Sequence, residues 1–542
     1  MSKKGKRSTA VLERPRPAEG KGGGKRDEKR RKHAGKADAA TAAALAQAAP
    51  AAPPPQGTAP AAPAQGTGAP PADGAASLRV EHVSHQEAVD RGLAARERAP
   101  LSSHAAWAPD AGRRPAVDTV ASQGATREPD LVPIRHGRMA ASPFAFFRGA
   151  AAVMAADLAS TPVSGVRVQA CGDAHLLNFG GFASAERNFV FDINDFDETI
   201  PGPWEWDIKR LAASIDVAAR EMAFDPADRR SCVLATVRQY REAMAAFAQQ
   251  SELDVWYARM DETTLMERVR SELDKTAVSN VERNMAKARQ KDNLKAFTKL
   301  TAVMDGNPRI VANPPLVVPL RDIVGEEQYA AREHELTDMF RAYRRSLQPD
   351  RRHLLEQYRL VDAARKVVGV GSVGTRCWVF LLSGRLDDDP LFLQAKEAQE
   401  SVLAPFVGKS RVSNQGQRVV EGQRVMQAAS DIFLGWVRVT GLDGKSRDFY
   451  VRQLWDWKTS IDVANQSPST LGAYGRVCGW VLARAHARSG DRIAIAAYLG
   501  ETDEFDEAIA SFATAYADQN EKDYEGFARA VERHEIPAVT GV

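Results

Sequence analysis

The chain has 542 residues, of which 44% are hydrophobic and 26% are charged, which suits a soluble globular protein of two or three domains or one large two-lobed body. No apolar run reaches membrane-spanning length, and the basic N-terminus lacks the apolar core of a signal peptide, so we expect neither a membrane span nor secretion. The net charge is +3, but residues 1–36 hold fourteen Lys or Arg and four Asp or Glu, which leaves −7 for the rest. An enzyme acting on nucleic acid is therefore not the expected class.

The cysteines give no sign of a metal site or of disulfides. All four are scattered along the chain without a CxxC pair: Cys171, Cys232, Cys377 and Cys478. This pattern argues against a zinc site and against a disulfide framework, and it fits a reducing compartment. We therefore expect a cytoplasmic protein.

Residues 1–78 are rich in Ala, Pro, Gly and Lys and nearly lack large apolar side chains. A segment of this composition buries too little apolar surface to offset the entropy lost on ordering, so we expect a disordered tail. Its basic charge can act as a solubilising surface or can contact nucleic acid or an anionic surface. Apart from this tail, neither nucleic acid nor a membrane is an expected partner.

The remainder is expected to alternate between helices and two groups of strands. Apolar residues at helical spacing predict helices at 142–160, 202–222, 229–250, 329–347, 415–430, 470–490 and 525–534. Runs rich in Val, Ile and Phe predict strands at 166–173, 187–195 and 310–320, and a small antiparallel β-unit at 366–382, 391–398, 433–439 and 448–458. This order predicts an α+β protein.

The segment GDAHLLNFG, residues 172–180, has the residue types that phosphoryl transfer requires. Asp173 and Asn178 are five residues apart, which is the Asp-x-x-x-x-Asn spacing of kinase catalytic loops. That spacing supplies a carboxylate to take the proton of an acceptor hydroxyl and, beside it, an oxygen ligand for Mg²⁺. His175 is expected to orient the loop. The alternative is a polar turn in which Asp173 and Asn178 cap neighbouring backbone groups.

A second acidic motif, FDINDFDE, spans residues 191–198. A strand that ends in the sequence DFD would place a carboxylate at its tip, where a second Mg²⁺ ligand is needed. Four acids in eight residues repel one another unless a cation compensates them. Asp195 and Asp197 are therefore expected to bind the metal together with Asn178. The alternative is a solvated acidic turn.

Three glycines, Gly369, Gly371 and Gly374, lie in KVVGVGSVGTRCWVFLL between two expected strands. A dinucleotide-binding fingerprint would open a helix at this point, whereas glycines between strands suit a loop folded over nucleotide phosphates. A β-bulge or a simple hairpin is the alternative.

Lys396 lies near the end of the next expected strand, where a lysine that binds phosphates is expected. Its carboxylate partner is expected on the following helix, at Glu421, with Glu397 or Glu400 as substitutes. An exposed strand lysine is the alternative for Lys396 alone. Taken together, the four motifs predict ATP and Mg²⁺ as cofactors.

The segment HARSGD, residues 486–491, also resembles a catalytic loop. However, the fifth residue after Asp491 is Ala496 instead of Asn, and no strand ending in DFD follows. We therefore expect HARSGD to be the end of a helix.

The segments GDAHLLN and DFD, joined by a strand, resemble the GDxHxxN and (I/V)DF(D/G) motifs of aminoglycoside phosphotransferases, choline kinases and their relatives. GPWEWDIKRLAAS also resembles the helix that follows those motifs. Across residues 90–530 the chain further resembles a bacterial family known as domain of unknown function 2252. The segments that carry this resemblance are VPIRHGRMAASPFAFFRGAAAVMAADLA, CGDAHLLNFG, FDINDFDETIPGPWEWDIKRLAAS and GWVLARAHARSGD. It implies no substrate.

The order of the motifs differs from that of ordinary kinases, in which the glycine loop, the lysine and the glutamate precede the catalytic loop. A circular permutation accounts for this difference, because permutation is tolerated when the termini lie close together at the surface. We thus predict a bilobed, circularly permuted, protein-kinase-like fold. Its expected parts are a tail at 1–78, a helical lobe at 79–365, a β-rich nucleotide-binding lobe at 366–460, and C-terminal helices at 461–542 that rejoin the helical lobe.

The sequence therefore predicts a phosphotransferase that uses ATP and Mg²⁺ and acts on an unknown hydroxyl of a small molecule or a protein. The expected roles are the base for Asp173, the Mg²⁺ ligands for Asn178 and Asp195, phosphate binding for Lys396, and orientation of Lys396 for Glu421. Two alternatives stay open. One is a nucleotide-binding pseudokinase with a regulatory role, and the other is a metal-dependent phosphoesterase, which the absence of an HxH or HExxH arrangement disfavours.

Overall fold

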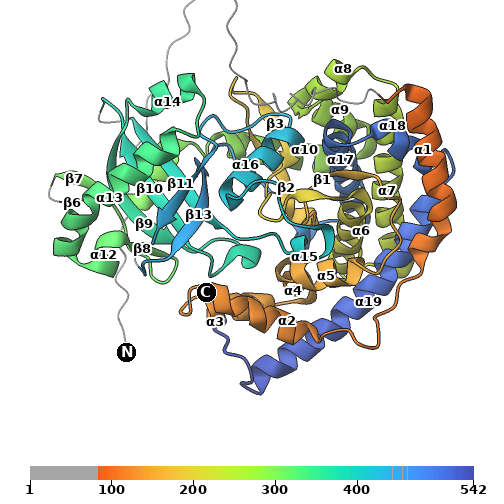
Figure 1. Ribbon diagram of the computed structural model, residues 1–542, viewed down its shortest axis with the longest axis horizontal. Helices are drawn as coiled ribbons and strands as arrows, with labels where there is room; N and C mark the ends of the chain where they lie inside the picture. Colours follow the sequence, from red (N-terminus) through yellow and green to blue (C-terminus); the bar gives the residue numbers. More distant parts are fainter. Residues whose placement is uncertain (1–82, 305, 387–388, 442, 455, 461) are drawn as a thin grey trace, which may run out of the picture. The chain divides into compact units, whose positions relative to one another are not determined.

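The computed structural model describes residues 83–542, apart from 305, 387–388, 442, 455 and 461. The tail expected at 1–78 lies outside the described residues. Helices and strands alternate as Figure 1 shows, so the predicted α+β class is confirmed. Residues Glu81–Val542 belong to one compact unit. In the part of the chain described here, no helix combines the length and the apolar character needed to cross a membrane.

A six-stranded antiparallel sheet, with the strand order β12-β13-β11-β10-β9-β8, contains the expected β-unit. Its strands are β8 Val317–Pro319, β9 Arg359–Lys366, β10 Cys377–Ser383, β11 Pro390–Ala398, β12 Gly435–Thr440 and β13 Ser446–Gln453. Aromatic and branched residues in β10 and β11 fit central strands that are buried on both faces. Because β8 and β9 belong to the sheet, it also includes residues before position 366, where the β-rich lobe was expected to begin.

Side chains alternate between the two faces of this sheet. On one face, Phe380 and Leu393 pack against a helix, α13 Glu326–Arg344, with the Phe340 and Phe380 rings 5.0 Å apart. On the other face, Lys396 stands opposite Tyr450 across the β11–β13 pair. The helix α16 Gln415–Met426 packs beside β11, β12 and β13. The lysine therefore belongs to the face that also carries Tyr450.

Helices from both ends of the sequence pack around a second, larger core (Figure 1). At its centre, α7 packs against α6 and α17, and α19 packs against α6. Besides α13 and α16, the α-helices within the described residues are α1 His85–Arg98, α2 Ala116–Ser122, α3 Val132–Met139, α4 Pro143–Gly149, α5 Ala151–Leu158, α6 Trp204–Glu221, α7 Pro226–Ala248, α8 Glu252–Tyr257, α9 Glu262–Glu272, α10 Lys275–Arg289, α11 Asn293–Leu300, α12 Leu320–Val324, α14 Pro349–Leu355, α15 Ala404–Val407, α17 Pro468–Ser489, α18 Arg492–Leu499 and α19 Glu504–Glu532.

Short strands next to this core carry the two acidic motifs. They are β1 Arg167–Ala170 paired with β4 Ile200–Pro203, and the three-stranded sheet of β2 Phe179–Ala183, β3 Phe189–Ile193 and β5 Met260–Asp261. The separate hairpin of β6 Thr301–Met304 and β7 Asn307–Ile310 instead packs beside β9 of the six-stranded sheet. The GDAHLLN segment follows β1, and the DFD segment follows β3. Each of these two segments therefore follows directly after a strand, as the sequence predicted.

Two expected elements are divided, and of the strand expected at 310–320 only β8 and the last residue of β7 are strands. The helix expected at 142–160 is split into α4 and α5, because the side chain of Arg135 takes the carbonyl of Gly149 (2.8 Å) out of the helical hydrogen-bond ladder. The β-run expected at 366–382 is interrupted between β9 and β10 by a loop with one turn of 3₁₀ helix, Val370–Ser372. The glycines of the G-x-G-x-x-G pattern lie in this loop.

Candidate functional site

The GDAHLLN loop is fastened to helix α6. Asp207, in the first turn of α6, accepts hydrogen bonds from the backbone N–H groups of Cys171 (2.6 Å) and Gly172 (2.8 Å). Two turns later, the hydroxyl of Ser214 accepts a hydrogen bond from the backbone N–H of Leu176 (3.0 Å). Residues seven positions apart share one face of a helix. This face of α6 therefore fixes the backbone of the loop.

Gly172 turns the chain toward the second motif. Its φ of +81° lies in the left-handed region, and a Cβ at this position would come 2.6 Å from the carbonyl oxygen of Glu198. Only glycine meets both conditions without strain. The loop can therefore lie directly against the DFDE segment.

Asp173, His175 and Asn178 form one turn. The Nδ2 of Asn178 donates to the carbonyl of Asp173 (2.6 Å), and the Nδ1 of His175 accepts from the backbone N–H of Leu177 (3.2 Å). With Nδ1 acting as an acceptor, the ring proton belongs on Nε2, which lies 3.8 Å from Oδ2 of Asp173. Burial lowers the pKa of His175 well below its ordinary value, with Arg210 and Arg148 adding to the effect, so the ring is neutral.

Among the described residues, only one oxygen of the Asp173 carboxylate pairs with an arginine. The guanidinium of Arg210, from α6, binds Oδ1 and leaves Oδ2 free of this contact. Burial raises the pKa of Asp173 to about 7; the charges of Glu198 and Asp195 act in the same direction, and Arg210 opposes them. A carboxyl that titrates near neutral pH is well suited to accept a proton in catalysis.

Two of the four acids in FDINDFDE have structural partners. Asp192 is buried in β3, and one terminal nitrogen of Arg484 from α17 donates to both of its carboxylate oxygens, at 2.5 and 2.6 Å. Glu198 accepts a hydrogen bond from the backbone N–H of Val402 (2.7 Å), and burial raises its pKa. The charge of this crowded segment is therefore partly neutralised within the protein.

Lys396 reaches the other two acids from β11. Its Nζ contacts Oδ2 of Asp197 and lies 3.6 Å from Oδ2 of Asp195. Asp197 also accepts hydrogen bonds from the hydroxyls of Tyr450 (2.8 Å) and Ser372 (3.0 Å). Burial alone would raise the pKa of Asp197, but Lys396 and these hydrogen bonds lower it. Burial would likewise lower the pKa of Lys396, but the two carboxylates hold it well above its usual value. Both groups are therefore ionised.

The glycine loop, which contains Gly369, Gly371 and Gly374, accepts hydrogen bonds from arginines that precede the GDAHLLN motif. Arg127 donates to the carbonyls of Gly371 (3.0 Å) and Val373, and Arg138 donates to the carbonyl of Val368 (2.6 Å). Gly374 ends the loop with a φ of +90°, which favours glycine. The loop is therefore held in place before any ligand binds.

One cavity of about 260 Å³ unites most of the residues that the sequence predicted for the site. Those that line it are Asp173, His175, Asn178, Asp195, Asp197, Gly369, Gly371 and Lys396. The glycine loop and Lys396 therefore lie at the same cavity as the two acidic motifs. Gly374 and Glu421 do not line the cavity.

The expected pair between Lys396 and Glu421 is not formed. Glu421 is exposed on α16 and accepts a hydrogen bond from a glutamine one turn earlier in the helix (2.6 Å). The buried face of α16 presents Arg418, which donates to the carbonyls of Asp197 (2.8 Å) and Thr199 (2.6 Å). The partner of Lys396 is therefore Asp197. Helix α16 contacts Asp197 through the hydrogen bond from Arg418 to the backbone carbonyl of Asp197.

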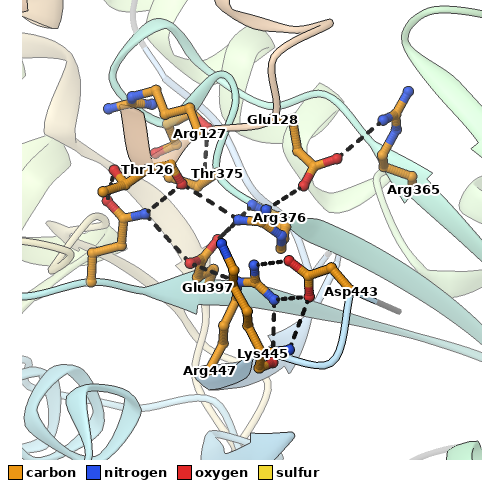
Figure 2. A network of polar contacts seen from close by, with 12 residues as sticks. Thr126, Arg127, Glu128, Arg365, Thr375, Arg376, Glu397, Asp443, Lys445 and Arg447 are labelled. Carbon is orange, nitrogen blue, oxygen red and sulfur yellow. Dashed lines mark hydrogen bonds and ion pairs between the residues drawn. The ribbon is translucent and has the colours of Figure 1, made fainter. Parts of the chain in front are cut away.

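Glu397 and Glu400, the two substitutes, do not pair with Lys396 either. Glu397 follows Lys396 in β11 and so points to the opposite face of the sheet. There its Oε2 accepts hydrogen bonds from the backbone N–H (3.1 Å) and the guanidinium (3.2 Å) of Arg376, and Arg447 lies 3.6 Å from Oε1 (Figure 2). Glu400 is exposed. The ion-pair network of Figure 2 is thus separate from the Lys396 cluster.

The cavity offers oxygen atoms that suit Mg²⁺. The side chain of Asp195 is 33% exposed, and Oδ1 of Asn178 accepts no hydrogen bond from any residue described here. Asp197, which was also expected to bind metal, is already engaged by Lys396, Tyr450 and Ser372. No group of three or more His, Cys, Asp or Glu residues suited to a metal occurs in the described ranges. A magnesium ion bound with a nucleotide needs only one or two protein carboxylates, so Asp195 and Asn178 fit it.

A comparison with known proteins identifies the family. The family model described as "Uncharacterized protein conserved in bacteria (DUF2252)" matches residues 127–530. The chain belongs to this family. No curated protein and no solved structure matches it.

The DUF2252 match includes several site residues that sequence reasoning missed. Asp207, Arg210 and Ser214 are polar residues at spacings of three and four on α6, a helix that is buried along most of its length. Polar residues on the buried face of a helix indicate that these side chains have partners inside the protein, because buried polar groups need hydrogen bonds. This pattern could have identified them as site residues. In the HARSGD segment, α17 ends at Ser489, as predicted. Its His486 lies 3.1 Å from Oδ2 of Asp207 and so supports the same loop.

Proposed function

We propose that this DUF2252 protein is a phosphotransferase that uses ATP and Mg²⁺ and acts on a hydroxyl acceptor. The observation that carries the proposal is the contact of Lys396 with Asp195 and Asp197 at a cavity that also contains Asp173 and Asn178. These are the groups that phosphoryl transfer needs: a cation for the phosphates, oxygen ligands for the metal and a base for the acceptor.

The arrangement of the sheet supports a kinase-like interpretation. The glycine loop joins β9 and β10, which are antiparallel neighbours, and Lys396 lies on β11, the next strand in the sheet. Kinases likewise place a glycine-rich loop over the phosphates and the phosphate-binding lysine on the third strand. Here these parts follow GDAHLLN in the sequence and yet meet it at one cavity. This supports a circularly permuted fold.

In the proposed reaction, the acceptor oxygen forms a bond to the γ-phosphorus of ATP, and the bond between that phosphorus and the ADP oxygen breaks. The hydroxyl proton goes to Oδ2 of Asp173, the oxygen that Arg210 does not bind. Asp195 and Asn178 would hold Mg²⁺, which neutralises phosphate charge. Lys396 would bind the phosphates, with Asp197 and Tyr450 fixing its position. Catalysis then rests on positioning and charge neutralisation.

ADP release from ATP and Mg²⁺, with water as the acceptor, tests the proposal. The wild type should release ADP, and Asp173→Asn should lower the rate about 100-fold or more, because a positioned base contributes at least that much. Arg114→Gln changes the charge of an exposed arginine and should have no effect. Equal rates in the wild type and in Asp173→Asn would refute the assignment of the base.

A second candidate function is a nucleotide-binding module without turnover. It is favoured by the fact that the key carboxylates are already paired, Asp173 with Arg210 and Asp197 with Lys396. Tight binding of ATP and Mg²⁺ by the wild type, without ADP release above the buffer rate, would select this candidate.

A further inference from the structure

Three arginines form a basic wall on one side of the cavity. They are Arg127, Arg135 and Arg148, and they come from the segment that precedes GDAHLLN. Gln123 and Gly149, from the same segment, line the cavity beside them. None of the three has an ion-pair partner within the described residues. We call this set the basic wall.

Arg135 is the most buried member of the basic wall, with an exposed fraction of 1%. One nitrogen donates to the side-chain oxygen of Gln123 (2.9 Å) and to the carbonyl of Gly149 (2.8 Å), while Nε and the other terminal nitrogen have no partner. Burial lowers its pKa well below the ordinary value, and the charge of Arg127 acts in the same direction. A buried guanidinium without a counter-charge is costly unless an anion compensates it.

Arg148 lies on the side of the proposed base. Its guanidinium makes no hydrogen bond or ion pair with any part of the chain that the structure describes, and its Nε is buried. Among the carboxylates, Asp173 has the largest electrostatic effect on the pKa of Arg148, and it raises that pKa. However, Asp173 already forms an ion pair with Arg210. The charge of Arg148 also helps to lower the pKa of His175. A positive group is thus available beside the base without a partner of its own.

Three other cations of the site have acidic partners, whereas Arg452 and Lys458, which also line the cavity, form no ion pair within the described residues. Lys396 pairs with Asp197, Arg210 pairs with Asp173, and Arg484 pairs with Asp192. In the proposed reaction, the phosphates of the nucleotide are bound by Lys396 and by the metal at Asp195. Arg452 and Lys458 interact electrostatically with Asp195, so they belong to the side proposed for the nucleotide, and the charge of the basic wall is left for a second anion.

We propose that the basic wall binds an anionic group, a phosphate or a carboxylate, that belongs to the acceptor and lies next to its reacting hydroxyl. The inference rests on the proposed function, because that function defines which side of the cavity receives the acceptor. Arg148 supplies free donors for the anion, and Arg135 adds a second positive charge at the same cavity. Guanidinium groups suit this role because they bind phosphate and carboxylate through two parallel hydrogen bonds. The substrate class is thus a phosphorylated alcohol or a hydroxy acid.

Calorimetric titration with inorganic phosphate, and separately with acetate, tests the basic wall. Each anion is added to the free protein and to the protein saturated with Mg²⁺ and a non-hydrolysable ATP analogue, which occupies the site of the γ-phosphate. We expect at least one anion to bind in both states. Arg148→Gln should weaken this binding about tenfold or more, which corresponds to one charge-assisted hydrogen bond. Arg148→Lys keeps the charge and should weaken it less, and the exposed Arg114→Gln should leave it unchanged.

Three results would overturn the inference: no binding of either anion, displacement of the anion by the ATP analogue, or an equal loss of analogue and anion affinity in Arg148→Gln. The last two would assign the basic wall to the nucleotide. If the analogue fails to bind while an anion binds in a way that depends on Arg148, the proposed function fails and the anion site stands.

Discussion

Replacing Lys396 by methionine should destabilise the protein, and more so at neutral pH than in acid. Lys396 is 3% exposed and contacts Asp197, so methionine keeps the aliphatic length but leaves the carboxylate without its cation. Breaking a buried pair from one side costs about 3–5 kcal/mol. Asp197 keeps the hydrogen bonds of Tyr450 and Ser372, so we expect a loss of about 2–3 kcal/mol near pH 7.5.

The pH dependence follows from the direction of the pKa shift of Asp197. In the wild type its pKa is lowered, so the charged form stabilises the fold above the ordinary value of 3.8. Without Lys396, burial is the largest remaining influence and raises the pKa above that value. The charged carboxylate then costs stability at neutral pH, and this cost disappears as the pH falls and the group is protonated. The deficit of Lys396→Met should therefore shrink toward pH 4.

Denaturant unfolding near pH 7.5 and near pH 5, followed by circular dichroism, measures this deficit. The matched variant is Lys396→Met combined with Asp197→Asn, which removes the unpaired charge and retains an acceptor for Tyr450. We expect the double variant to recover much of the lost stability near pH 7.5. An equal deficit of Lys396→Met at both pH values, together with no recovery in the double variant, would refute the description of this ion pair.

Three further predictions concern the GDAHLLN loop. Asp173→Ala should leave the affinity for ATP and Mg²⁺ within about twofold in calorimetry and lower ADP release about 100-fold or more; a parallel loss of binding would contradict the role of a base. Burial raises the pKa of Asp173 to about 7, and the carboxyl must be ionised to accept a proton. The rate of ADP release should therefore rise about tenfold per pH unit up to that value and then level off. A rate that does not change with pH would exclude Asp173 as the base. Gly172→Ala should lower the free energy of unfolding by about 1–3 kcal/mol more than Gly165→Ala, since both have positive φ but only the Cβ at 172 would meet a carbonyl oxygen; equal losses in denaturant unfolding would contradict this.

Local sequence predicted the members of the site because short motifs carry chemistry in their residue types and spacing. Asp173 and Asn178 lie in one turn, so the local chain alone brings these two residues together, although contacts with α6 fix the loop. Arg210 and Asp207 were not predicted, because a helical pattern alone does not say which polar side chains turn inward. That choice depends on how α6 packs beneath the loop.

The error at Glu421 has a similar cause. Which face of α16 meets the sheet is set by the packing of Val419 and Val420, both fully buried. This packing turns Arg418 toward the DFD segment and Glu421 toward solvent. The pairing of Lys396 with Asp197 joins segments that are remote in the sequence, so it could not be derived from local spacing.

The basic wall shows the same limit. Arg148 lies in the helix expected at 142–160 and Arg135 precedes that helix, and neither arginine was predicted to belong to the site. Arg135 reaches the cavity at the break between α4 and α5, where it binds the carbonyl of Gly149. No local pattern in the sequence predicts this break, since the apolar spacing continues across it.

Calorimetric titration of ATP, with and without Mg²⁺, into the wild type and Asp195→Ala tests the central claim most directly. If the cavity is a nucleotide site, the wild type should bind ATP much more tightly with Mg²⁺ than without it, because the metal links Asp195 to the phosphates. Asp195→Ala should lose this dependence on Mg²⁺. If the wild type binds no ATP, or if Asp195→Ala binds ATP and Mg²⁺ as tightly as the wild type, these motifs do not form a nucleotide site.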